Sequence, residues 1–253
     1  MKKIKSLLVL WKNSTNNLYY HVGTLYFDGA LYTFHYTLEQ DAHRKVGDAL
    51  RNGYRLHPAF PILDTVYKSK NLFSAFDRRI PSSDRVDYED ILINLGLSKQ
   101  ADRMDILCET RGMLAGDSYS FEQPIRLYED RHLMTSFYIN GMRHRKLPPS
   151  WSLLLQNDEK LNFIIEEENP GDPNAVRIET SGGLHLGYVP AVYAKAIKSL
   201  IQQKIQLSIS IKGIRPESAP QWWVSLTIEA DLKENQLDFV NDSQLNGLVQ
   251  LTA

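Results

Sequence analysis

The chain has 253 residues, of which 43% are hydrophobic and 23% are charged, the ordinary balance of a globular protein. Lys and Arg together number 29 against 30 Asp and Glu, which leaves a net charge of −1. A protein that coats duplex DNA without sequence preference needs a strongly positive surface, so this composition excludes that class. The length is enough for two domains of ordinary size.

The chain carries few signals of secretion or membrane insertion. Cys108 is the only cysteine, so no intrachain disulfide can form and a reducing, cytoplasmic compartment is expected. The first residues are basic and apolar, but the apolar run stops at Lys12, which favours a first β-strand over a signal peptide. No apolar stretch approaches the roughly 20 residues that a membrane-spanning helix needs, and no membrane contact is expected.

The first third of the chain alternates strand-like runs with turns. Strands are expected over residues 22–27 and 31–36, and Asp28-Gly29 between them is a turn dipeptide suited to a hairpin. After a proline-rich segment, residues 87–96 have one apolar face and are predicted to form a helix that Asp87 caps and Gly96 ends. A second short helix is expected around residues 104–109.

A polar segment near residues 126–131 separates this block from a second one. The second block is predicted to contain strands over residues 134–139, 161–165 and 175–178, a helix over 191–203, and strands over 205–211 and 222–228. We therefore expect an α+β protein of two domains, at residues 1–127 and 131–232. Residues 233–253 are expected to form an acidic, polar tail that docks on the rest.

The sequence contains no recognisable catalytic arrangement. A glycine-rich phosphate loop and a Cys/His set at zinc spacing are both missing. Cys108 follows the apolar run Met104–Leu107, a context in which an inert buried thiol is more common than a nucleophile. The sequence therefore indicates a non-catalytic protein, for which neither a cofactor nor a metal is expected.

Three segments of the second block carry a binding signal. The first, residues 137–145, is a strand followed by Gly141 and the basic run Arg143-His144-Arg145, where Arg can bind a phosphate and a ring can stack on a base. The second, residues 168–176, is a Pro-stiffened loop of Asn and Asp, which can bind a ligand hydroxyl or form ordinary Asx turns. The third is Gly187-Tyr188-Val189-Pro190 ahead of a helix. Solvated basic residues at a strand end are the alternative for the first.

The order of these segments resembles the HIRAN family over residues 133–231. The resemblance implies a small β-barrel with helices that grips the 3′ end of single-stranded DNA. It implies that Arg143 contacts a phosphate, that His144 and Tyr188 line the base or sugar pocket, and that Asp172 accepts a hydrogen bond from the terminal hydroxyl. Asn169 and Asn174 would shape the loop.

Two departures from the family pattern affect this site. Arg145 stands where an aromatic residue is usual, and it is retained as a nucleic-acid-binding candidate. The run Glu166-Glu167-Glu168 is expected to form an acidic edge that repels a DNA backbone, so Glu166→Arg is predicted to strengthen binding.

The first block resembles the amino-terminal subdomain of HipA-type proteins over residues 7–121. The resemblance is carried by runs such as Val22–Leu25, Tyr32–Tyr36, Tyr67–Phe73 and Thr110–Met113. In that family the subdomain precedes a kinase domain and contacts a HipB-like DNA-binding partner, and a detached version, HipS, is an antitoxin against a separate kinase. Phe60, in a loop stiffened by prolines, is predicted to anchor the partner; packing into its own core is the alternative.

Two functions therefore remain open for this chain. The leading hypothesis is a HipS-like antitoxin of a bacterial toxin–antitoxin system, which neutralises a HipT-like toxin kinase and uses its HIRAN-like domain for a DNA or protein contact. The alternative is an accessory factor that binds single-stranded DNA 3′ ends in DNA repair or phage defence.

Overall fold

The computed structural model describes residues 5–38, 44–156, 159–236 and 248–252. The chain divides into two compact units, Met1–Pro124 and Ile125–Ala253. The division falls ahead of the predicted boundary at residue 127, because the strand that begins at Ile125 pairs within the second unit. The mixed α+β class is confirmed, with sheets as the larger part of each unit.

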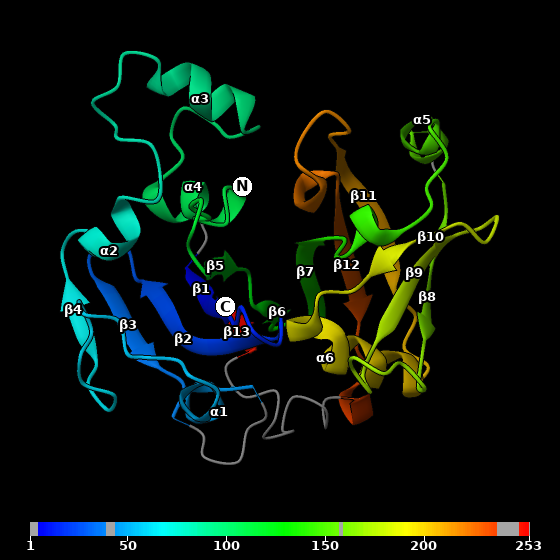
Figure 1. Cartoon of the computed structure of the whole chain (residues 1–253), viewed down its shortest axis with the longest axis horizontal. Helices are drawn as coiled ribbons and strands as arrows, with labels where there is room; N and C mark the ends of the chain where they lie inside the picture. Colours follow the sequence, from blue (N-terminus) through cyan, green and yellow to red (C-terminus); the bar gives the residue numbers. More distant parts are fainter. Residues whose placement is uncertain (1–4, 39–43, 157–158, 237–247, 253) are drawn as a thin grey trace. The chain divides into compact units, whose positions relative to one another are not determined.

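A five-stranded sheet in the order β4-β3-β2-β1-β5 is the framework of the first unit (Figure 1). Every neighbouring pair in it is antiparallel. The strands are β1 (Ser6–Lys12), β2 (Tyr19–Phe27), β3 (Tyr32–Tyr36), β4 (Tyr67–Ser69) and β5 (Tyr119–Glu122). The predicted hairpin joins β2 to β3: Asp28 Oδ1 accepts the backbone N–H groups of Ala30 and Leu31 at 2.8 Å each, and Gly29 takes a φ of 102°.

The helices of the first unit are α1 (Val46–Arg51), α2 (Ser74–Asp77), α3 (Tyr88–Asn94) and α4 (Arg103–Glu109). The two predicted helices are α3 and α4, and Gly96 follows α3 with a φ of 74°. The expected capping of α3 by Asp87 is wrong. The Asp87 carboxylate accepts hydrogen bonds from the guanidinium of Arg85 at 2.8 Å and accepts none from the helix N–H groups. In α4, Asp102 does cap the helix, in a reciprocal arrangement with Asp105.

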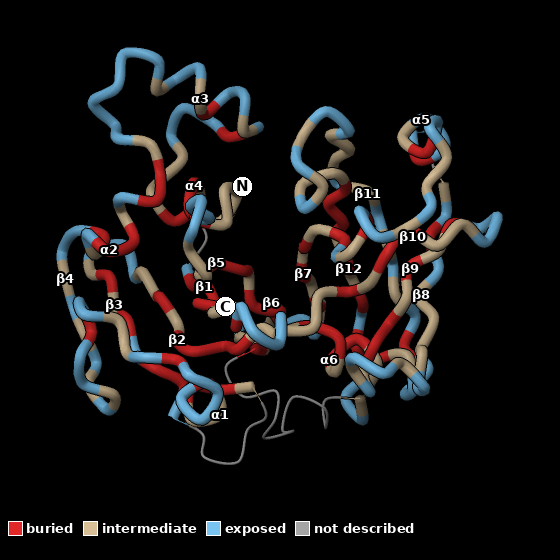
Figure 2. Tube along the Cα trace, in the orientation of Figure 1, coloured by how far each residue is buried: buried red, intermediate tan, exposed pale blue. Residues whose placement is uncertain are grey.

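Aromatic side chains fill the core of the first unit. Figure 2 shows the strands of this unit with many buried residues, in red. Phe60 is 1% exposed and lies 4.4 Å, between ring centroids, from Phe34 on β3. Its backbone is held as well, since the Tyr36 hydroxyl donates to the Phe60 carbonyl at 2.8 Å. The prediction that Phe60 anchors a partner is therefore wrong: burying the ring among other rings gains more than leaving it in water.

The second unit contains two sheets. One has the order β11-β12-β7-β6-β13 and the other β10-β9-β8. The expected tail contributes β13, which pairs in parallel with β6. The strands are β6 (Ile125–Tyr128), β7 (His132–Tyr138), β8 (Leu161–Ile165), β9 (Val176–Thr180), β10 (His185–Tyr188), β11 (Ser208–Ile214), β12 (Val224–Asp231) and β13 (Val249–Thr252).

The two sheets are joined by a bridge between Asn140, just after β7, and Tyr188 at the end of β10. The bridge gives a continuous strand order β8-β9-β10-β7-β12-β11. Helix α6 (Ala191–Gln202) packs its apolar face against these strands: Tyr193 is fully buried and stacks on Phe137 of β7 with ring centroids 5.2 Å apart.

The other helical segments of the second unit are short: α5 (Trp151–Leu155) and the 3-10 turns η1 (Met142–His144), η2 (Pro220–Trp222) and η3 (Glu234–Gln236). Over the described ranges of the chain, no helix is long and apolar enough to cross a bilayer.

Candidate nucleic-acid interface

The bridge between Asn140 and Tyr188 brings two of the three predicted segments together. Each residue donates its backbone N–H to the other's carbonyl at 2.9 Å. The close approach requires a glycine beside it, because a Cβ on Gly187 would lie 2.4 Å from the Asn140 carbonyl oxygen. Gly141 then turns the chain with a φ of 78°, so that the basic run of η1 lies beside β10.

The first basic residues of this run face solvent. Arg143 and His144 are both exposed, and Arg143 Nε donates to His144 Nε2 at 2.9 Å. The contact requires the imidazole to be neutral at Nε2 and leaves the terminal nitrogens of Arg143 to other acceptors. An exposed arginine with donors in a fixed fork suits a phosphate oxygen.

Arg145 is held differently, since its guanidinium carbon lies over the Tyr188 ring at 5.5 Å from the centroid. Its Nε is buried without a hydrogen-bond partner, and over the described part of the chain no carboxylate lies within 4 Å of its charge. Arg145 therefore combines a stacking plane with unused donors. Tyr188 is covered on this face by Arg145, and His185 meets the ring at 85° with centroids 5.0 Å apart.

Glu166 lies against two of the predicted site residues. Asn169 Nδ2 donates to its carboxylate at 2.9 Å. This hydrogen bond, and next the neighbouring Tyr188 hydroxyl, hold the pKa of Glu166 below its usual value. The pKa of Tyr188 is raised by burial and next by the neighbouring Glu166. The simple picture of Glu166 as a repulsive edge is therefore incomplete.

The loop after β8 is built from its own polar side chains. Asn169 Oδ1 accepts the backbone N–H groups of Gly171 and Asp172 at 2.9 and 3.1 Å, and Asp172 Oδ1 accepts that of Asn174 at 2.9 Å. From helix α6, Lys198 Nζ donates to the Pro173 carbonyl at 2.9 Å. The Asx-turn alternative for Asn169 and Asp172 is thus observed. These turns also fix the loop beside Glu166.

Two members of the cluster were not predicted. Arg177 on β9 lies opposite Tyr188 in the strand register and contacts Glu179 at 2.8 Å and Glu166 at 3.9 Å. Burial, and next the charge of Arg145, lower the pKa of His185. The sequence signal for Arg177 is the alternation on β9, where Arg177 and Glu179 lie between buried Val176, Ile178 and Thr180.

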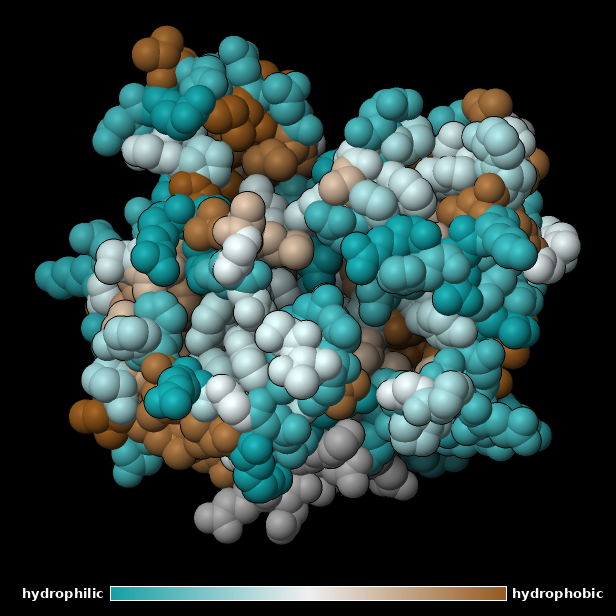
Figure 3. Space-filling model, in the orientation of Figure 1, coloured by the Kyte–Doolittle hydropathy of each residue, from teal (hydrophilic) through white to brown (hydrophobic). Residues whose placement is uncertain are grey.

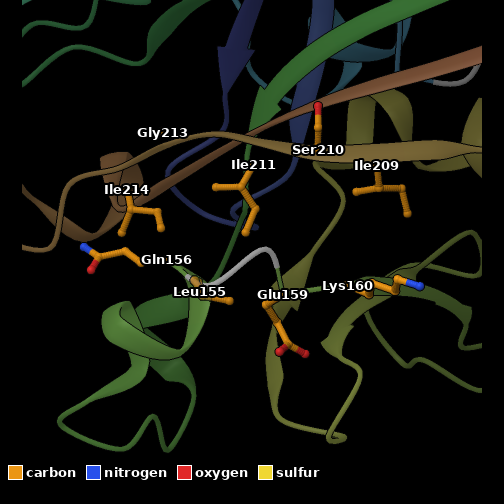
Figure 4. A pocket seen from close by; sticks show the side chains of 9 residues that line it. All are labelled: Leu155, Gln156, Glu159, Lys160, Ile209, Ser210, Ile211, Gly213 and Ile214. Atoms are coloured by element: carbon orange, nitrogen blue, oxygen red, sulfur yellow. The ribbon is translucent and has the colours of Figure 1, made fainter.

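A separate open groove of about 600 Å³ lies between β11 and the residues that lead into β8 (Figure 4). One wall is β11, with Ile209, Ile211 and Ile214, and the other is formed by Leu155 and the residues that lead into β8. Glu159 at its edge is tied to the β9–β10 turn through Ser181, at 2.7 Å. None of the predicted site residues lines this groove.

Comparisons with known proteins place this unit in a family. The model of the HIRAN domain family matches residues 132–233. Among solved structures, the crystal structure of the HIRAN domain of human HLTF is similar at 17% identity and a TM-score of 0.34, over 45% of this chain and 87% of that one. No curated protein sequence matches the chain. All of the predicted nucleic-acid residues lie inside the matched range, and residues 132–233 form a HIRAN domain.

Proposed function

We propose that the HIRAN domain binds the 3′ end of single-stranded DNA, in the manner of an accessory factor for DNA repair or phage defence. The supporting observation is the bridge from Asn140 to Tyr188, which gathers three sequence-distant segments around one tyrosine ring. Two arginines, a set of rings and a loop with fixed acceptors then lie in one region. Base stacking and phosphate contacts of this kind bind single strands with little sequence preference.

The roles follow from the position of each side chain. Arg143 is exposed, and its terminal nitrogens bond no acceptor among the described residues, so it binds a backbone phosphate; Arg145 on Tyr188 offers a stacking plane to a base. Asp172 accepts the terminal 3′-hydroxyl, while its Oδ1 also holds the N–H of Asn174. Asn169 and Asn174 keep that loop in place, and His144 extends the ring surface next to Arg143.

Fluorescence anisotropy at low salt tests the proposal with one short labelled oligothymidylate that ends in a 3′-hydroxyl or a 3′-phosphate. The hydroxyl end is expected to bind roughly ten- to a hundredfold more tightly, the worth of one charged hydrogen bond. Asp172→Asn keeps the turn acceptor but removes the charge, and should reduce this difference. Arg143→Ala should weaken both strands and lower the salt slope by about one. No binding of either strand rejects the function.

For the first unit we propose a second role, that of a HipS-like antitoxin whose partner is a HipT-like kinase. The observation in its favour is that most of the exposed large apolar side chains belong to this unit, which Figure 3 shows as brown areas. Two of them, Ile62 and Val66, are each 54% exposed in the loop that follows Phe60. The Tyr67 hydroxyl fixes this loop by bonding the N–H and the carbonyl of Ile62, at 2.7 and 3.0 Å.

A rigid loop with exposed apolar tips loses little entropy when a partner covers it. Co-expression with a kinase-type toxin encoded beside this protein's gene should relieve growth arrest. The double variant Ile62→Asp, Val66→Asp should abolish relief, whereas Leu153→Asp, an equally exposed leucine of the second unit, should not. Continued arrest with the full-length wild-type protein rejects the antitoxin role.

A further inference from the structure

Three consecutive glutamates follow β8, and their surroundings differ. Glu166 is half-buried and accepts a hydrogen bond from Asn169 at 2.9 Å, with the Tyr188 hydroxyl close enough to affect its pKa and Arg177 at 3.9 Å. Glu167 and Glu168 are exposed, and within the described part of the chain neither side chain makes a hydrogen bond or an ion pair. The carboxylate of Glu166 therefore lies within the fold, whereas those of Glu167 and Glu168 face the solvent.

The internal carboxylate connects three elements. Its own residue directly follows β8 and donates its backbone N–H to the Ala175 carbonyl at 2.9 Å. Asn169 belongs to the loop that contains Asp172, and Tyr188 belongs to β10 and supports Arg145. A single group thus sets the position of the loop and of the ring at the same time.

We infer that Glu166 is a positioning residue of the nucleic-acid site, and that Glu167 and Glu168 alone repel the strand. The inference rests on the proposed DNA binding. It reverses the expected sign for Glu166, since removing this carboxylate should loosen Tyr188 and Asn169 and weaken binding. It keeps the expected sign for its two neighbours, whose charges face the solvent through which a strand approaches.

Binding of a short oligothymidylate with a 3′-hydroxyl, measured by anisotropy, gives the test. Glu166→Ala should bind about tenfold more weakly, because the hydrogen bond to Asn169 and the contact with the Tyr188 hydroxyl, which orient the site, are lost. Glu166→Gln keeps an acceptor oxygen and should recover part of the loss. The matched control Glu167→Ala, Glu168→Ala should bind roughly two- to threefold more tightly. Glu166→Ala binding as tightly as the wild type, or more tightly, overturns the inference.

A second measurement separates this inference from the DNA proposal. In protein labelled with 3-fluorotyrosine, the ¹⁹F resonance of Tyr188 is assigned by its loss in Tyr188→Phe. Glu166→Ala should shift that resonance, and the double variant at residues 167 and 168 should leave it in place. An unmoved resonance overturns the positioning role, whatever the DNA result. A shifted resonance in a protein that binds no strand supports the positioning contact and rejects only the DNA function.

Discussion

Arginines in the two units are used in opposite ways. In the first unit, the side chain of Arg79 is 1% exposed, and its donors end on the carbonyls of Ala75 and Gly112, at 3.2 and 3.0 Å, and on the carboxylate of Asp117. In the second unit, Arg145 lies on a tyrosine ring with a buried Nε that has no hydrogen-bond partner. The guanidinium nitrogens of Arg79 each have a hydrogen-bond partner within the fold, whereas the buried Nε of Arg145 has none.

This difference gives a criterion that separates structural charges from binding charges. Arg111 also has a buried Nε without a hydrogen-bond partner, but its guanidinium contacts the carboxylate of Glu122. A lone unpaired nitrogen is therefore a weak criterion. A cation that stacks on a ring and contacts no carboxylate of the described chain is a stronger one, because an outside anion or base can still lower its free energy.

The largest expected effect is a loss of stability of the first unit when the buried Arg79 is removed. Arg79→Ala leaves Asp117 and two carbonyls without their donor and should cost the first unit about 3–5 kcal/mol of stability. Urea denaturation followed by circular dichroism measures the loss. The exposed pair of Arg85 and Asp87 is the control, and Arg85→Ala should unfold close to the wild type, because a solvent-screened pair adds little stability. Equal losses for the two variants would show that Arg79 is not structural.

The next effect concerns the backbone contact on which the second unit's site depends. Gly187→Ala puts a Cβ 2.4 Å from the Asn140 carbonyl oxygen, so the bridge to Tyr188 must open. Such overpacking costs about 1–3 kcal/mol, and the loss should appear in the thermal unfolding of the second unit. Gly182→Ala, whose Cβ would lie 3.9 Å from its nearest neighbour, should unfold like the wild type.

Arg145→Ala should reduce the affinity for a single strand much more than the stability of the fold. Loss of the contact with Tyr188 should cost the fold only about 0.5–1 kcal/mol. The affinity for a single strand should fall about tenfold, since the stacking plane and the unused donors disappear together. Paired thermal melts and anisotropy titrations make the comparison with Arg79→Ala. A large loss of stability with unchanged affinity would mean that Arg145 is structural as well.

The smallest expected effect is a pH dependence at the start of the HIRAN domain. His132 bonds Asp231 across β7 and β12 at 2.8 Å, and this hydrogen bond raises the pKa of His132 above its ordinary 6.5. The charged pair therefore stabilises the fold fully below pH 6.5, and its contribution is lost as the pH rises through the folded pKa. A partly exposed pair is worth a few tenths of a kcal/mol. Thermal melts of the wild type below pH 6.5 and above the folded pKa of His132 should differ slightly in melting temperature. His132→Gln should remove this difference.

Local chemistry explains why much of the fold was predictable. The hairpin around Asp28, helices α3, α4 and α6, and the strands β2, β3, β7, β8 and β9 depend on periodicity and turn residues within a few positions. The HIRAN segments were recognisable for the same reason, because each is a short run with a glycine or an Asx turn at a set place. These features require no knowledge of distant neighbours.

Other features were decided by contacts between distant residues. The fate of Phe60 depends on Phe34 and Tyr36, and the role of Glu166 depends on Tyr188, which lies on another strand. Strand β13 acquires its place only by pairing in parallel with β6, at the other end of the unit's sequence. Local sequence patterns specify the short elements and identify the candidate residues. Which charges are paired inside the fold and which still face a ligand was decided by tertiary packing, because partners far apart in sequence set the energy of a charge.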